Sequence, residues 1–274
     1  MSDRQDPPRL PLPFYDRPWR GEERLVARAL WDWHRTLWSA GRAPGRRQID
    51  WERVAAEVQE GRPVEGLPSA VYRAAREACR TAHLPQDLLA EQVRALDHLK
   101  PPVRFDDVAG LRAFVETFTG AHARLLARLA GATGRWQEPL IHDLAFGFFL
   151  VGRLAALPDD LRRDALFIPL RELERRQVTL ADLRDAPPTP AVQRLLWQYA
   201  IRAREALAAG RPLIDELDRR FQREGRRCWI GALEVLDVIE RHRFDVWNHP
   251  PSLSRIRRWR IRWQARFGRT VFGR

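Results

Sequence analysis

Apolar residues recur at the helical period through nearly the whole chain, and no segment alternates as a half-buried strand does. Residues 21–40 illustrate the pattern, with one stripe made of Leu25, Ala29, Trp33 and Leu37. Residues 137–156 form the most apolar of these stretches, which predicts a central position for that helix. A chain of 274 residues can bury one large core. We therefore predict an all-α, single-domain fold of about ten helices.

Prolines, glycines and capping residues set the predicted helix boundaries. Asp50 is expected to cap the second helix, and Asp106 or Asp107 the helix that begins near residue 108. A break is expected near Gly120. The predicted helices cover residues 21–40, 51–60, 68–81, 85–99, 108–120, 121–131, 137–156, 169–176, 179–184, 191–209, 211–224, 226–243 and 252–267, with irregular segments at 157–168 and 186–190.

The Pro- and Arg-rich residues 1–20 form an N-terminal segment ahead of the domain, which covers residues 21–274. This segment has no apolar signal core, and no apolar run approaches the ~20 residues that a bilayer span needs. Cys79 and Cys228 are isolated, as buried thiols in a reducing compartment are. We expect a cytoplasmic protein, with peripheral attachment to the inner face of the membrane as a further option.

The chain is strongly basic, with a formal net charge of +12 and a single lysine, Lys100. Arginine keeps its charge and binds phosphate through a planar fork, although genome base composition also produces such a bias. Net charge alone does not choose among nucleic acid, anionic lipid and a phosphorylated substrate. Nucleic acid is the weakest of these, because the basic residues are interleaved with acids and no recognition motif is present.

The last segment, residues 252–274, carries eight arginines and no acid. We predict a basic amphipathic helix at 252–267, with one stripe made of Ile256, Trp259, Trp263 and Phe267. One interpretation is a helix that lies on an anionic membrane through Arg255, Arg258, Trp259, Arg262 and Trp263. The other is a last helix packed on the domain with its basic side in water.

Several short motifs follow one another in a fixed order. They are Phe14-Tyr15 with ALWDWHRTL at 29–37, LPQDLL at 84–89, Arg104-Phe105 with Val108 and Leu111, the segment 144–176 and LDVIERHRFDV at 236–246. Their order and spacing resemble those of the squalene/phytoene synthase family. The resemblance implies an isoprenoid synthase fold, with helices around a central cavity and two aspartate-bearing helices that face each other. It also implies magnesium-dependent head-to-head coupling of two isoprenoid diphosphates.

The chain departs from that family at both aspartate-rich motifs. The degenerate motif positions are Trp38, Ser39 and Arg42 in the first motif and Gly152, Ala156 and Asp160 in the second. Asp160 is the only retained candidate for a metal ligand. Magnesium needs hard oxygen ligands, and its Lewis acidity is what ionises the substrate in the family. We therefore predict no cofactor, although the family implies magnesium, and no ordinary prenyl coupling.

Arginines and aromatic residues take the place of those acids. The candidate cavity residues are Arg35, Trp38, Arg42, Phe114, Phe118, Phe149 and Arg153. The arginines could bind a phosphate or carboxylate without metal, or be ordinary solvated side chains. The aromatic residues could line an isoprenoid tunnel, or fill it as plain core.

Two functional hypotheses remain open. The first is a catalytically degenerate member of the family that acts by binding an isoprenoid, another lipid or a protein partner, as an assembly factor or a synthase subunit does. The alternative is an isoprenoid diphosphate transferase with altered chemistry. Function on a shared fold depends on the site, so the geometry around Arg42, Arg153 and Asp160 has to distinguish them.

Overall fold

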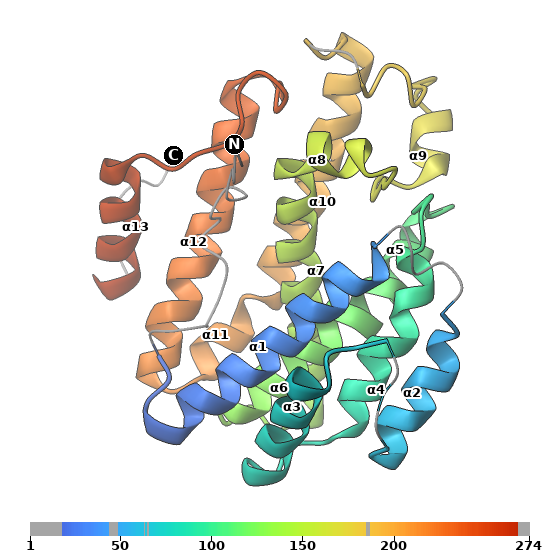
Figure 1. Ribbon diagram of the computed structural model, residues 1–274. Helices are drawn as coiled ribbons and strands as arrows, with labels where there is room; N and C mark the ends of the chain where they lie inside the picture. The colour runs from blue at the N-terminus through green and yellow to red at the C-terminus, as the bar shows by residue number, and fades with distance from the viewer. Residues whose placement is uncertain (1–17, 44–48, 63, 65, 185–186, 268–274) are drawn as a thin grey trace, which may run out of the picture.

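The centre of the molecule is a pair of long helices, α7 (Glu138–Ala155) and α10 (Pro190–Gly210), which pack along each other (Figure 1). Glycines allow this close approach. A Cβ atom on Gly147 would lie 2.7 Å from Cγ of Leu207, and one on Gly210 would lie 2.6 Å from the backbone nitrogen of Leu144. The prediction that the apolar segment 137–156 forms a central helix is therefore confirmed.

The computed structural model describes residues 18–43, 49–62, 64, 66–184 and 187–267. Most of the predicted N-terminal segment 1–20 thus lies outside the described residues. Around the central pair the other elements are α1 (Gly21–Gly41), α2 (Trp51–Glu60), α3 (Ser69–Thr81), α4 (Asp87–Arg94), η2 (Ala95–Leu99), α5 (Val108–Val115), η3 (Glu116–Gly120), α6 (Ala121–Leu129), η4 (Arg135–Gln137), α8 (Leu157–Arg162), α9 (Leu170–Glu174), α11 (Pro212–Glu216), α12 (Arg219–Arg241) and α13 (Arg255–Phe267).

The arrangement is that of one all-α domain, as predicted. α1 crosses the front of the molecule and packs against α3, η2 and α6, while α12 and α13 form a pair at one side (Figure 1). Across the described ranges, β-pairing is limited to one isolated parallel bridge, between Val103 and Ala165. None of the helices seen there is long and apolar enough to cross a membrane.

Side-chain caps fix several helix starts where the sequence predicted them. The carboxylate of Asp50 accepts a hydrogen bond from the backbone N–H of Arg53 at the start of α2. Of the two candidates for the next cap, it is Asp107 that accepts from the backbone N–H of Gly110 at the start of α5. These bonds satisfy donors that the first helical turn leaves unpaired.

Four predicted boundaries are wrong. The backbone at Gly120 stays helical, because the π-helical segment η3 joins α5 directly to α6. Residues 157–168 contain the helix α8, and residues 179–184 form turns instead of a helix. The break before the penultimate helix comes at Leu217, whose backbone is extended, whereas Gly225 lies buried inside α12.

We expect Gly210→Ala to lower the free energy of unfolding by about 1–3 kcal/mol, because the new methyl group would meet backbone atoms of α7 that cannot move independently. Urea unfolding monitored by circular dichroism measures this. The control is Gly110→Ala in α5, where the nearest atom would lie 3.6 Å away and helix propensity favours alanine. Equal effects of the two substitutions would contradict the close packing of α7 on α10.

Candidate functional site

Three of the predicted site residues converge on one buried ion-pair network. Nη2 of Arg42 donates a hydrogen bond to Oδ1 of Asp160 at 2.7 Å. Nη1 of Arg153 lies 2.9 Å from both carboxylate oxygens of Asp160. The side chains of Asp160 and Arg42 are only 3% and 7% exposed, and that of Arg153 is 20% exposed. The one acid that remains at either motif is thus held by two protein cations.

Three separate elements bring this network together. Arg42 follows the last residue of α1, Arg153 lies in the last turn of α7, and Asp160 lies in α8. The segment that directly follows α8 is held by Val103, whose backbone N–H donates to the carbonyl of Asp164 and whose carbonyl accepts from the N–H of Leu166. The two degenerate motifs therefore face each other, and the contact between them is Arg42 on Asp160.

The indole of Trp38 packs against both arginines. The guanidinium carbon of Arg42 lies 4.7 Å from the ring centroid, and that of Arg153 lies 4.8 Å from it. Arg153 also lies over Phe167, at 5.6 Å. Cations over aromatic faces are stabilised by the ring quadrupole, more strongly where water is excluded. Trp38, which the sequence resemblance places at a degenerate motif position, therefore contributes to holding both cations.

Burial and charge act against each other in this network. Burial raises the pKa of the Asp160 carboxyl, and the guanidiniums of Arg153 and Arg42 oppose that rise. Burial likewise lowers the pKa of Arg42, while the charge of Asp160 opposes that fall. A guanidinium keeps its proton throughout the physiological range, so the ionised carboxylate is the form of Asp160 that matches its two partners.

Little free space remains beside the network. A cavity of about 10 Å³ borders Arg153, Asp160, Phe167 and Tyr199. That volume is close to the minimum that holds one water molecule. A diphosphate group would therefore fit only if the arginines and the carboxylate moved apart.

The donors that a magnesium site needs are not assembled here. Within the described part of the chain, no three His, Cys, Asp or Glu residues lie close enough together to hold a metal ion. Asp160 alone remains, and its oxygens accept hydrogen bonds from guanidinium groups. Magnesium is usually bound by one or two carboxylates with phosphate and water completing an octahedron. The residues present do not fit that ion.

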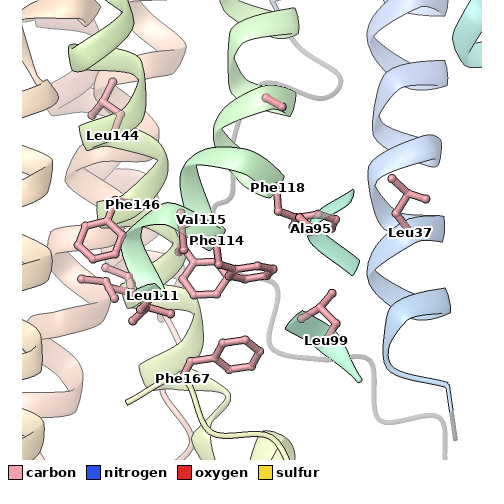
Figure 2. Close-up of a cluster of buried hydrophobic side chains, with 14 of the residues drawn as sticks. Leu37, Ala95, Leu99, Leu111, Phe114, Val115, Phe118, Leu144, Phe146 and Phe167 are labelled. Carbon is pink, nitrogen blue, oxygen red and sulfur yellow. The ribbon is translucent and has the colours of Figure 1, made fainter. Parts of the chain in front are cut away.

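Aromatic rings fill the space between α1, α5, η3 and α7. The rings of Phe114 and Phe118 stack with centroids 5.7 Å apart, and Phe167 lies below them (Figure 2). Phe149 meets Phe114 and Phe167 edge-on, at 5.9 and 5.4 Å. Trp38 stacks on Phe167 at 5.7 Å. At this level of the fold the predicted cavity residues Phe114, Phe118 and Phe149 are packed core.

An apolar pocket of about 110 Å³ lies farther along the bundle, between α6, α7 and α11. Its walls include Leu126, Ile141, Leu144, Phe148, Leu213 and Leu217. None of the candidate cavity residues lines it. Apolar pockets are the usual form of a lipid or small-molecule site, but an engineered cavity of about 150 Å³ holds only a benzene-sized ligand.

The remaining predicted positions do not join the network. Arg35 was predicted to line the cavity, but its side chain is 68% exposed and pairs with Asp32 at 3.4 Å. Ser39 is also exposed. Gly152 is buried inside α7, and Ala156 forms the junction of α7 and α8. Arg35 is excluded because its position on α1 faces solvent and not α7.

A stacked histidine pair, with His34 half-buried and His122 buried, was not predicted. The rings of His34 on α1 and His122 on α6 stack with centroids 4.4 Å apart, and Nδ1 of His34 lies 3.0 Å from Oε1 of Gln92. Burial lowers the pKa of His34 to about 4, despite the hydrogen bond that its Nδ1 donates to Oε1 of Gln92. Burial and the neighbouring His34 lower the pKa of His122 well below its ordinary value. Both imidazoles are therefore neutral in the folded protein at pH 7.

We expect Asp160→Asn to lower the free energy of unfolding by about 3–5 kcal/mol, because it leaves two arginines without their buried counter-charge. Urea unfolding at pH 7 measures the change. Asp159→Asn is the matched control, because Asp159 pairs with Arg162 at the surface and should change the stability by about 0.5 kcal/mol or less. Similar effects of the two substitutions would show that the Asp160 network contributes no more than a surface pair.

Because of the histidine pair, we expect the free energy of unfolding to fall as the pH is lowered. The unfolded chain takes up protons at the ordinary histidine pKa of 6.5, whereas folded His34 does so only near 4. The stabilisation is therefore complete above pH 6.5 and is lost as the pH falls towards 4, at about 1.4 kcal/mol per pH unit for each histidine. Unfolding measured between pH 7 and 4.5 tests this.

His122→Phe should remove about half of that dependence, because it deletes one of the two protons taken up on unfolding. The control is His83→Asn, at an exposed position with a φ of 52° that asparagine tolerates. It should leave the pH profile unchanged. A wild-type slope in His122→Phe would contradict the assignment.

Comparison with solved structures shows the same fold in isoprenoid synthases. A dehydrosqualene synthase in complex with a ligand superposes with a TM-score of 0.76 at 12% identity, covering 90% of this chain and 87% of that one. The squalene synthase HpnC of Alicyclobacillus acidocaldarius gives a TM-score of 0.62 at 20% identity, covering 71% and 72%. YisP of Bacillus subtilis gives 0.61 at 18% identity, covering 89% and 99%.

Sequence comparison agrees with the shared fold. The chain is 24% identical over 159 residues to a phytoene synthase of Thermus thermophilus, covering 58% of this chain and 53% of that protein. The chain thus spans about half the length of this curated relative. The family model for squalene/phytoene synthase matches residues 20–266. A match across nearly the whole described domain shows that this chain belongs to the squalene/phytoene synthase family.

Proposed function

We propose that this chain is a non-catalytic member of its family that acts by binding. The observation that carries the proposal is the network in which Arg42 and Arg153 hold Asp160. In the family reaction, as the sequence resemblance implies it, magnesium bridges acids on two facing helices and neutralises the departing diphosphate. Here the same two segments are joined by a direct protein contact.

The chemistry of ionisation supports this proposal. Metal ions contribute several kcal/mol of charge stabilisation to such a transition state. At about 1.4 kcal/mol per factor of ten, the loss of that stabilisation slows ionisation by roughly a thousandfold or more. The arginines offer no ready substitute, because their charges are directed at Asp160 and Trp38 in a space of about 10 Å³.

The packing of the core also supports a non-catalytic role. The stacked rings of Phe114 and Phe118 occupy the middle of the bundle, where the resemblance places the substrate cavity. The apolar pocket of about 110 Å³ takes a ring-sized or short branched group, and a whole isoprenoid chain would need that pocket to widen. The partners that suit a binding role are therefore a short segment of lipid, an active synthase of which this chain is a subunit, or a complex whose assembly it assists.

We expect purified protein to release no diphosphate from farnesyl or geranylgeranyl diphosphate and to form no coupled product, with or without magnesium. Phosphate-release and product-extraction assays measure this, with an active phytoene synthase assayed in parallel. Magnesium together with a diphosphate substrate should also leave the melting temperature unchanged, because a ligand that binds the folded state raises it.

Each outcome of this experiment has a separate meaning. Magnesium-dependent coupling would overturn the proposal and favour a transferase with altered chemistry. Stabilisation by the isoprenoid diphosphate without any product would contradict the expected absence of diphosphate binding and would make an isoprenoid the ligand of a non-catalytic protein. No change in either assay would support the binding role and direct the search to a protein partner.

A further inference from the structure

The helix α13 has two different apolar faces. One face packs on the domain, where Ile261 and Ala265 are 3% and 2% exposed. Arg257 and Arg260 strengthen that contact by pairing with Glu234 of α12, the first at 3.2 Å. The helix therefore lies in a fixed orientation along α12, at one side of the molecule (Figure 1).

The second face of α13 points away from the domain. Ile256 is 79% exposed, Trp259 is 65% exposed and Trp263 is 39% exposed. At about 100° per residue, these three positions lie on the side of the helix opposite Ile261 and Ala265. The stripe predicted from the sequence thus exists, but it faces solvent, and a different set of residues makes the packing contact.

Basic residues flank the exposed stripe without any acid on the same helix. Arg255 and Arg262 are exposed along one edge of the stripe, and Arg258, also exposed, lies between that edge and the packed face, where its Nε donates to the carbonyl of Leu253. Arg262 also lines a pocket of about 300 Å³ together with Arg220, Arg223, Glu224 and Arg227 of α12. Positive charge therefore continues from α13 onto the neighbouring surface of α12.

We infer that the outward face of α13 binds an anionic membrane surface, with the helix lying parallel to it. Tryptophan suits this position, because its ring is apolar and its N–H remains wet at the headgroup level. The flanking guanidiniums would meet lipid phosphates, which they bind through paired hydrogen bonds. Uniform positive charge beside an exposed apolar stripe is the pattern of helices that lie in the membrane interface.

The charge pattern favours a lipid surface over a protein partner. A protein interface of stable size presents a broad apolar core with a rim of both signs. The exposed face of α13 is instead one helix wide, and its charged residues are all arginines. A membrane supplies both an apolar layer for Trp259 and a dense array of anions for Arg255 and Arg262.

The test is vesicle flotation of the full chain. We expect binding to vesicles of equal parts phosphatidylcholine and phosphatidylglycerol, weakened by salt, and at least roughly tenfold weaker binding to phosphatidylcholine alone. The variant Arg255→Gln/Arg258→Gln/Arg262→Gln should bind the anionic vesicles roughly a hundredfold more weakly. The charge-matched control replaces the exposed Arg73, Arg184 and Arg194 with Gln and should retain most of the binding.

A second measurement tests the apolar stripe with single substitutions, which alter the protein surface far less than the triple variants do. Lipids brominated in the upper acyl chain should quench tryptophan fluorescence, and Trp259→Phe should remove part of that quenching. Trp136→Phe, at an exposed tryptophan on η4, should not. Wild-type protein that fails to float with anionic vesicles, or equal losses in the two arginine triples, would overturn the inference. So would dimerisation through α13 without vesicle binding.

Discussion

The carboxylate of Asp160 is the contact on which the arrangement of the site depends. Its two oxygens accept hydrogen bonds from Arg42 at the end of α1 and from Arg153 at the end of α7, so one acid joins three elements. A buried carboxylate is costly unless cations and hydrogen-bond donors surround it. Arg42 donates to one oxygen of Asp160, and Arg153 supplies the hydrogen bond to the other oxygen. The rings of Trp38 and Phe167 then cover those guanidiniums.

In the proposed non-catalytic role, this contact takes the place of the exchangeable cation that the family resemblance implies. A magnesium ion leaves with its product and keeps open coordination positions for phosphate and water. The guanidinium of Arg42 does neither, because it is tethered to α1 and its Nη2 already donates to Asp160. On this proposal, the charge balance around Asp160 leaves no open position for a substrate anion.

Helix periodicity was sufficient to predict the all-α architecture, because packing faces are local properties of each segment. It failed at Gly120, where two helices join without a break, and at α8, a helix of six residues with too few turns to show a period. At the site, the missing acids were evident from residue types alone. The pairing of Arg42 with Asp160 spans 118 positions and depends on the tertiary fold, so no local pattern could give it. Arg35 lies outside the network because of the rotation of α1 about its axis, which likewise depends on the tertiary fold.

The helix α13 shows why an amphipathic pattern alone does not reveal its partner. Its sequence has a clear apolar stripe, yet α13 is attached to the domain by other residues. These are Ile261, Ala265 and the two arginines that pair with Glu234. The stripe at Ile256 and Trp259 is left outside as exposed apolar surface, which marks an interaction site when it is contiguous. The docking of α13 thus fixes which way that stripe faces. A helix held rigidly in this way meets a surface without first having to fold, which reduces the entropy lost on binding.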